Sequence, residues 1–251
     1  MAVILYLDLL GSRSRWREGG AAAAREAFDA FTGLVIAAAK PDLDAVIDGG
    51  IETDSAALVC SDAAAALRIA RRAYVKALFR DHPDKNHRTW LRGAVVPSDD
   101  APLRTSRPAN GRASQLSIWI YSPSFFDAVA IEKSGFKGMR LLIHSSLMNT
   151  QLKNGSRIPI GSLFLMPIRR LRHSSYPKMK DGDVLEYLWM IGNDAAEWTN
   201  LQFQMAKRLR EANSDPEEFA QAAATQVVFH EADALFRSLS HRAKVLATAK
   251  P

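Results

Sequence analysis

The first 145 residues alternate between short apolar runs and longer segments of helical periodicity. The run at residues 2–8 is rich in β-branched and aromatic side chains and is closed by Gly11, which predicts a buried strand. A basic turn with Arg13, Arg15 and Arg17 is expected next. Between Ala21 and Lys40 the larger apolar side chains recur at helical spacing, and Pro41 ends this pattern. The chain is therefore expected to begin with a strand followed by a helix.

Two short strands are predicted next, at residues 44–50 and 54–60. The segment Gly49–Thr53 is the expected hairpin connection between them. Ser61 then offers an N-cap for an amphipathic helix. The apolar face of that helix carries Leu67, Ala70, Tyr74, Ala77 and Leu78.

The rest of this region is predicted to hold a strand at 90–96, a polar loop at 97–114, a helix at 124–133 and a strand at 139–143. The order is βαββαβ followed by αβ. It predicts an α+β protein with a ferredoxin-like sheet that carries its helices on one face.

Beyond residue 145 the pattern is less regular. It predicts strands at 158–168 and 184–191, then helices at 194–212 and 216–250, the last capped by Asp215. We therefore expect a first domain at residues 1–145. A C-terminal extension at 146–251 is expected to pack on it or to form a dimer interface.

Composition narrows the class of protein. With 251 residues, 47% hydrophobic and 24% charged, the chain has the balance of a folded domain rather than of a disordered one. Its single cysteine, Cys60, excludes an intrachain disulfide and suits a reducing compartment. The first apolar run stops at Asp8 without a basic lead-in, and no run reaches the ~20 apolar residues that a membrane span needs. A cytoplasmic protein without a membrane partner is expected.

The net charge gives a further hint about partners. Lys and Arg total 33 and Asp and Glu total 27, which leaves a formal charge of +6. This excess points towards phosphate-bearing partners. Binding to nucleic acid ranks last among the readings, because the basic residues are interleaved with acids and no DNA- or RNA-binding motif is present.

Two aspartates carry the strongest chemical signal. Asp8 falls at the end of the first strand, and Asp54 falls between the second and third strands. A carboxylate that interrupts an apolar strand is costly to desolvate unless it is paired or binds a cation. On neighbouring strands the two could converge on Mg²⁺ or Mn²⁺, which prefer hard oxygen ligands. Either residue alone could instead cap a turn or close a hairpin.

The sequence motifs around these aspartates resemble a known family. The motif apolar-Asp-apolar-x-Gly that ends at Gly11, the hairpin with Asp54 and the segment Leu91–Val95 resemble the catalytic domain of class III nucleotidyl cyclases. The segment Ser122–Glu132 resembles the family's helix that ends in a Leu-Glu-like pair before a strand. The chain is most similar to the pyrimidine (uridylate or cytidylate) cyclases of bacterial Pycsar antiphage systems, over residues 2–145.

The resemblance implies a metal-dependent lyase. Asp8 and Asp54 would be the catalytic carboxylates and, with the backbone of Leu9, would hold two divalent ions, Mn²⁺ or Mg²⁺. The nucleotide is expected to contact Leu10, Gly11, Ser12, Gly50 and Arg92. Arg92 could equally be a surface arginine beside a strand. Arg104, Arg107 and Arg112 could either fold over a triphosphate or form a solvated basic loop.

The sequence also departs from the family pattern. Purine cyclases carry a base-selecting lysine four residues before the hairpin aspartate, and here that place is Gly50. Their helix supplies an asparagine and an arginine for the transition state, and those places fall at Phe126 and Ala130. The missing lysine favours a pyrimidine substrate. The missing pair means that other groups do this work or that the protein is catalytically weak.

The leading hypothesis is a homodimeric cyclase that converts UTP, or CTP, to the 3′,5′-cyclic nucleotide (cUMP or cCMP) and pyrophosphate. By resemblance this product would be a second messenger in antiviral defence. The alternative is a catalytically inactive cyclase-like domain that binds a nucleotide or a protein partner.

Overall fold

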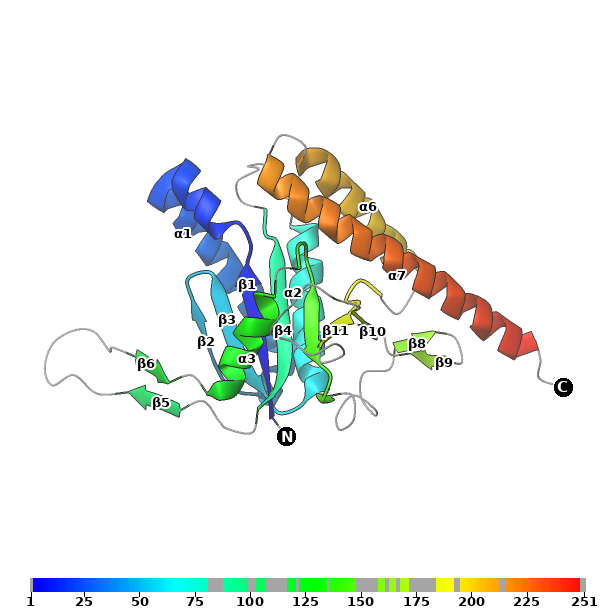
Figure 1. The fold of residues 1–251 in the computed structure, drawn as a ribbon, viewed down its shortest axis with the longest axis horizontal. Coiled ribbons are helices and arrows are strands. Elements are labelled where there is room, and N and C mark those ends of the chain that lie inside the picture. The colour runs from blue at the N-terminus through cyan, green and yellow to red at the C-terminus, as the bar shows by residue number, and fades with distance from the viewer. Residues whose placement is uncertain are drawn as a thin grey trace, which may run out of the picture.

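The computed structural model describes residues 2–80, 88–98, 103–106, 117–120, 122–134, 136–147, 158–160, 163–165, 168–171, 184–191, 195–212 and 215–248. Within these residues one mixed sheet contains β1 (Ala2–Leu9), β2 (Val46–Glu52), β3 (Ser55–Cys60), β4 (Leu91–Ser98), β7 (Leu141–His144), β10 (Ile168–Arg170) and β11 (Val184–Tyr187). The helices are α1 (Ser12–Ala39), the short 3₁₀ helix η1 (Lys40–Ala45), α2 (Ala63–Phe79), α3 (Pro123–Glu132), α6 (Ala195–Glu211) and α7 (Pro216–Thr248) (Figure 1). Two small two-stranded sheets are formed by β5 (Leu103–Ser106) with β6 (Ser117–Ile120), and by β8 (Ile158–Ile160) with β9 (Leu163–Leu165).

The strand order of the main sheet is β10-β11-β7-β4-β1-β3-β2. Strand β1 is central and runs antiparallel to both β3 and β4, and β2 pairs with β3 at the edge. The order β4-β1-β3-β2 is that of a ferredoxin-like βαββαβ unit, so the predicted α+β class is confirmed. Strands β4 and β7 are parallel, which requires the crossover connection that contains α3.

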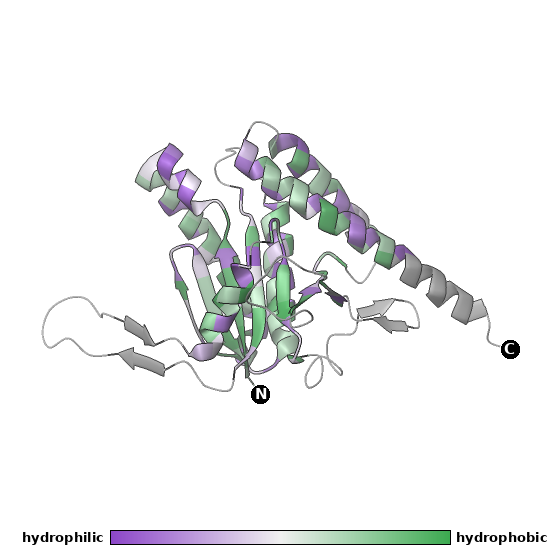
Figure 2. Ribbon diagram, in the orientation of Figure 1, coloured by the Kyte–Doolittle hydropathy of each residue, from purple (hydrophilic) through white to green (hydrophobic). Residues whose placement is uncertain are grey.

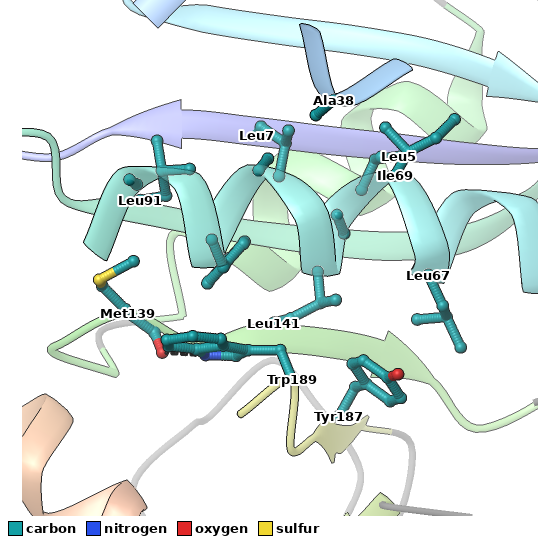
Figure 3. Close-up of a cluster of buried hydrophobic side chains, with 14 of the residues drawn as sticks. Leu5, Leu7, Ala38, Leu67, Ile69, Leu91, Met139, Leu141, Tyr187 and Trp189 are labelled. Atoms are coloured by element: carbon teal, nitrogen blue, oxygen red, sulfur yellow. Dashed lines mark hydrogen bonds between the residues drawn. The ribbon is translucent and has the colours of Figure 1, made fainter. Parts of the chain in front are cut away.

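The two faces of the sheet are both covered, which corrects the expectation that the helices share one face. Alternate residues of β1, among them Leu5 and Leu7, pack on the side of α1 and α2, as Figure 3 shows. The intervening residues Ile4 and Tyr6 pack with Ala128 and Ile131 of α3 on the other side. Successive side chains of a strand point to opposite faces, and β1 is apolar at nearly every position, so both faces need a cover.

The C-terminal segment shares the core of the first 145 residues. Trp189 packs against Tyr74 of α2 at a ring distance of 5.1 Å, and its indole Nε1 donates a hydrogen bond to the carbonyl of Met139 at 2.9 Å. Phe229 of α7 meets Trp189 edge to face and stacks on Trp198 of α6. Figure 2 shows the hydrophobic residues gathered on the sheet and on the helix sides that adjoin it.

Helix α1 begins earlier than predicted. It starts at Ser12 rather than Ala21, and Gly20 has non-helical angles inside it, with φ 70° and ψ −167°. The residues before Gly20 therefore form a separate helical piece rather than the expected turn. The sequence pattern failed here because this piece is mostly exposed and carries no apolar periodicity.

The hairpin and the cap that follow also differ from the prediction. The connection between β2 and β3 is the two-residue turn Thr53–Asp54, and Gly49 lies inside β2. A Cβ atom at Gly49 would lie 2.8 Å from Leu58 Cδ2, so the glycine serves close strand packing. The N-cap of α2 is Asp62, not Ser61, because the Asp62 carboxylate accepts the Ala65 amide at 2.8 Å.

Other predicted elements differ in extent. The loop expected at 97–114 includes the end of β4 and all of β5, and residues 99–102 and 107–114 lie outside the described part of the chain. The single strand expected at 158–168 is divided among β8, β9 and the start of β10. Helices α3, α6 and α7 are confirmed to within two residues at their ends.

No described helix is both long enough and apolar enough to cross a bilayer.

Candidate active site

The structure brings Asp8 and Asp54 to one end of the central strands. Asp8 lies opposite Ser55 of β3 on one side and opposite Arg92 of β4 on the other. Asp54 immediately precedes β3, and its carbonyl accepts a hydrogen bond from the Leu9 amide at 2.7 Å. The two aspartates are thus held by adjacent backbone segments, and the charge of Asp54 acts on the Asp8 carboxyl group.

The Asp54 carboxylate is fixed by two hydroxyl groups. Ser12 Oγ donates to Asp54 Oδ2 at 2.6 Å, and Thr53 Oγ1 donates to Oδ1 at 3.1 Å. Ser12 is the first residue of α1, so this contact joins the turn between β2 and β3 to the start of the helix. Both oxygens keep lone pairs for a further ligand, since a carboxylate offers about four acceptor positions.

The turn between β1 and α1 presents the start of a helix beside these carboxylates. Gly11 is the N-cap of α1 and has φ 78° and ψ 12°, a left-handed conformation that glycine adopts without strain. The first turn of α1 contains no acidic residue. A helix start of this kind directs backbone amides and the positive end of the helix dipole at anions.

Burial and neighbouring carboxylates raise the pKa of Asp8 to about 7. Loss of solvent is the largest cause, followed by the charges of Glu132 and Asp54, while Arg92 and Lys133 act in the opposite direction. Near neutral pH the Asp8 carboxyl group is therefore only partly ionised in the absence of a cation. Such a perturbed acid at the end of a strand is typical of a functional site.

A buried ion pair lies beside Asp8. Arg92 Nε donates to Glu132 Oε1, and Arg92 Nη1 donates to the Phe136 carbonyl at 3.0 Å. The Glu132 side chain is fully buried, and its Oε2 atom has no hydrogen-bond partner among the described residues. Burial raises the pKa of Glu132, and Arg92 opposes this rise. Sequence reasoning assigned Glu132 no role, although a carboxylate at the end of an apolar helix face was a signal that it needed a partner.

Tyr6 lies two positions before Asp8 on β1, so its phenol is on the same face of the sheet as the Asp8 carboxylate. Burial raises its pKa, and the charge of Asp8 raises it further, while a hydrogen bond with Ser55 lowers it. Phe125 of α3 meets the Tyr6 ring edge to face at 5.7 Å. Tyr6 was not singled out from sequence, because an aromatic residue in an apolar strand has no pattern that separates site from core.

The other predicted nucleotide contacts occupy three places. Leu10 is buried, and its amide donates to the Trp90 carbonyl at 2.9 Å. Gly50 lies opposite Ala57 on the edge strand β2. The guanidinium of Arg92 is held by Glu132 and the Phe136 carbonyl, and a nucleotide contact through it stays a prediction.

Several other candidates can be placed only in part. Phe126 is 61% exposed and Ala130 is also exposed, so the two positions of the missing asparagine and arginine lie on the outer side of α3. Arg104 lies on β5, whose side chains are outside the described structure. Arg107 and Arg112 are outside the described residues altogether.

The C-terminal helices buttress the β1–α1 turn. Trp90 Nε1 and Arg88 Nη1 both donate to Glu218 Oε1 of α7 at 3.2 Å. The Trp90 carbonyl in turn accepts the Leu10 amide, and the Arg88 carbonyl accepts a hydrogen bond from Arg15 Nη2. A small pocket between Gly11 and Glu218 marks where α7 meets the turn. No sequence pattern links residues so far apart, and this contact was missed.

The donor set suits a hard divalent cation. The two carboxylates and the backbone carbonyls around Leu9 offer only oxygen ligands. The charges of Arg92 and Lys133 lower the pKa of Asp8 by less than burial raises it, so these two cations compensate the buried carboxylate only in part. Within the described residues no group of three or more His, Cys, Asp or Glu side chains is arranged to hold a metal. A metal bound here would therefore need ligands beyond protein side chains, such as backbone carbonyls and phosphate oxygens.

Comparison with solved structures identifies the fold. Two structures of adenylate cyclases from Trypanosoma brucei in their monomeric state match with TM-scores of 0.51 and 0.53 at 12% and 11% identity. They cover 74% and 77% of this chain and 86% and 91% of their own. The guanylate cyclase domain of RhGC from Catenaria anguillulae, solved in complex with GTP, matches with a TM-score of 0.53 at 11% identity over 74% of this chain and 94% of its own.

The chain has the class III nucleotidyl cyclase fold. No protein-family model matches the sequence, and no curated protein does. In the cyclase fold of this chain, the aspartate pair lies at the end of β1 and before β3, and Glu218 of α7 contacts Trp90 next to the β1–α1 turn.

Proposed function

We propose that this chain is a divalent-metal-dependent nucleotidyl cyclase that forms a 3′,5′-cyclic nucleotide and pyrophosphate from a pyrimidine nucleoside triphosphate. The observation that carries the proposal is the pair Asp8 and Asp54, held side by side on a cyclase fold next to the start of α1. The fold alone would fit many activities. The raised pKa of Asp8 is a second support, because burial and neighbouring carboxylates destabilise its negative charge and a bound cation would stabilise it.

The residues of the site have distinct tasks in this reaction. Asp8, Asp54 and the Leu9 backbone would hold two Mn²⁺ or Mg²⁺ ions, which supply charge neutralisation for the attacking 3′-oxygen and the leaving pyrophosphate. Gly11 and Ser12 belong to the turn whose amides would face the triphosphate, whereas the Leu10 amide donates to the Trp90 carbonyl, so a nucleotide contact of Leu10 stays a prediction. The 3′-oxygen bonds to the α-phosphorus, the bond from that phosphorus to the pyrophosphate oxygen breaks, and the hydroxyl proton passes to water.

A pyrimidine substrate is supported by Gly50. This glycine occupies the place of the base-selecting lysine of purine cyclases, and it has no side chain to read a purine. The resemblance to the pyrimidine cyclases of Pycsar systems covers uridylate and cytidylate cyclases alike, and we take UTP as the leading substrate with CTP as the alternative. That resemblance also supports a role of the cyclic product as a messenger in antiphage defence.

A homodimer is part of the proposal. The groups that complete a class III site come from a second subunit in that family, and here the described residues on the outer side of α3 include the exposed Phe126. A single exposed aromatic ring is common on protein surfaces, so the support for a dimer is the resemblance to the family and not this ring. We place the protein in the cytoplasm on its single cysteine.

The test is direct. Purified protein is incubated with each of the four nucleoside triphosphates and Mn²⁺, and the products are separated by chromatography and identified by mass. The proposal expects cUMP, or cCMP, together with pyrophosphate. Formation of cAMP or cGMP alone would contradict the pyrimidine assignment, and no cyclic product from any substrate would contradict the activity.

A catalytically inactive cyclase-like domain is the second candidate. Phe126 and Ala130 replace the asparagine and arginine that act in the transition state of purine cyclases, and this observation favours it. An inactive domain would bind a nucleotide without turning it over. Binding that survives Asp8→Ala, with no turnover by the wild-type protein, would support this candidate over the first.

A further inference from the structure

We propose that the Arg92–Glu132 ion pair sets the net charge beside Asp8 and thereby the affinity of the site for divalent metal. The inference rests on the proposed metal site at Asp8 and Asp54. It deepens that proposal by giving a task to Glu132, and it gives Arg92 a task other than contact with the nucleotide.

The pair lies on the same face of the sheet as Asp8. Arg92 is directly opposite Asp8 in the β1–β4 register, and residues that are directly opposite in an antiparallel pair project to the same side. Glu132 ends α3, which covers that side, and its carboxylate receives the Arg92 guanidinium. The electrostatic neighbours of Asp8 include both Arg92 and Glu132.

Burial makes the pair more than a surface contact. The Arg92 side chain is 15% exposed and that of Glu132 is 0% exposed. Arg92 is held further by the Phe136 carbonyl, so its position is fixed independently of any ligand. Only one of the two side-chain oxygens of Glu132 is hydrogen-bonded within the described residues, because Oε2 has no partner there.

The charges explain what the pair does. Arg92 alone would place a positive charge beside Asp8 and repel a divalent cation. Glu132 opposes that charge and the smaller effect of Lys133, and its own effect on Asp8 is larger than that of Arg92, so the site retains the two negative charges of Asp8 and Asp54 for the metal. In a partly buried site a single uncompensated charge several ångströms away changes ion affinity by about an order of magnitude.

Direct metal binding tests this without relying on turnover. Mn²⁺ is titrated into the full chain, and the signal of free Mn²⁺ is followed by electron paramagnetic resonance. We expect Glu132→Gln to weaken Mn²⁺ binding by about tenfold. The double variant R92Q/E132Q removes both charges and is expected to return the affinity to within about threefold of wild type.

Glu186→Gln is the matched control. Glu186 is also a fully buried carboxylate paired with arginines, Arg140 and Arg169, but it lies on β11, which β7 and β4 separate from β1. This variant is expected to lose stability on a similar scale while its Mn²⁺ affinity stays at the wild-type value. Thermal melting of each variant reports the stability change separately from the metal affinity.

Arg92→Gln provides a second arm should E132Q fail to fold. With the cation gone and the carboxylate kept, Mn²⁺ is expected to bind at least as tightly as to wild type. Unchanged affinity in E132Q, equal weakening in E132Q and the double variant, or weaker binding in R92Q would overturn the inference. So would a wild-type chain that binds no Mn²⁺. If these metal affinities behave as expected but no cyclic nucleotide forms, the inference stands and the proposed activity fails.

Discussion

The hydroxyl of Ser12 donates to Asp54 Oδ2 across 2.6 Å, which joins the first residue of α1 to the turn between β2 and β3. These residues are 42 positions apart in the sequence. The bond fixes one carboxylate oxygen of the aspartate pair relative to the helix start. The strand end, the hairpin turn and the helix start are thereby held together as one unit.

Removing this bond should reduce activity more than stability. Ser12→Ala leaves the fold intact and is expected to cost about 1 kcal/mol of unfolding free energy, the usual value for one hydrogen bond. Cyclase kcat should fall by roughly tenfold, because a misplaced metal ligand is costly in catalysis. Ser61→Ala, which removes an exposed hydroxyl that contacts Asp62, is the control. Equal loss of activity in both variants would show that the Ser12 contact has no special role.

The left-handed conformation of Gly11 should make it intolerant of a side chain. A Cβ atom there would meet only Ser14 Oγ at 3.7 Å, so the expected cost comes from φ 78° and not from a clash. Gly11→Ala should destabilise the chain by about 1 kcal/mol and shift the first amides of α1.

Gly33→Ala is the matched control for this substitution. Gly33 lies within α1, and a Cβ atom added there would meet nothing within 4 Å, so alanine should raise the unfolding free energy by about 0.5–1 kcal/mol. Denaturant titration measures both variants. A stabilising effect of alanine at Gly11 would contradict the assigned role of the turn.

The raised pKa of Asp8 predicts a pH dependence of stability in metal-free protein. The pKa is about 7 in the folded chain against an ordinary value of 3.8, so the folded state binds the Asp8 proton more tightly than the unfolded state does. The stabilisation from this proton is complete below the ordinary pKa and is lost as the pH rises through 7.

Asp8→Asn removes this dependence because an amide does not titrate. At pH 8 the variant should be more stable than the metal-free wild type by about 2 kcal/mol, after allowance for solvent screening of a half-buried group. At pH 4 the two should be nearly equal. Thermal melting in the presence of a chelator follows the difference, and a difference that does not change with pH would contradict the assignment.

The buttress from α7 predicts an effect at a distance. Glu218→Gln weakens the contact to Arg88 but keeps a side-chain oxygen that can accept the Trp90 indole N–H. The unfolding free energy should therefore fall by about 1–2 kcal/mol. Activity should fall severalfold through kcat, since Leu10 and Arg15 are held by the carbonyls of Trp90 and Arg88. Glu217→Gln changes an exposed neighbour and serves as control. A fall confined to KM would point to a substrate contact and not to a support of the turn.

Much of the sheet could be predicted from sequence, because its strands are short apolar runs bounded by turns. The aspartates stood out for the same reason, since Asp8 interrupts such a run. The Arg92–Glu132 pair could not be foreseen, because it depends on how α3 crosses the sheet, 40 residues along the chain from Arg92. The contact of Glu218 with Trp90 spans 128 residues and follows only from the tertiary packing of α7.

The first piece of α1 shows another limit. An exposed helical segment before Gly20 has no apolar stripe, so its sequence resembles that of a basic turn. The nearly continuous apolar run of β1 already indicated that both faces of the sheet are covered, but the assignment of helices to faces could not be predicted. A strand that is apolar at nearly every position does not reveal which helix lies on which face.

The most direct test of the central claim is cyclisation of UTP and CTP with Mn²⁺ by the wild-type chain and by Asp8→Asn and Asp54→Asn. The wild-type protein should release the 3′,5′-cyclic nucleotide and an equal amount of pyrophosphate. Each variant should lose activity by at least about a thousandfold while it keeps a cooperative thermal transition. Cyclic product formed at the wild-type rate by either variant would contradict the assignment of this aspartate pair as the catalytic centre.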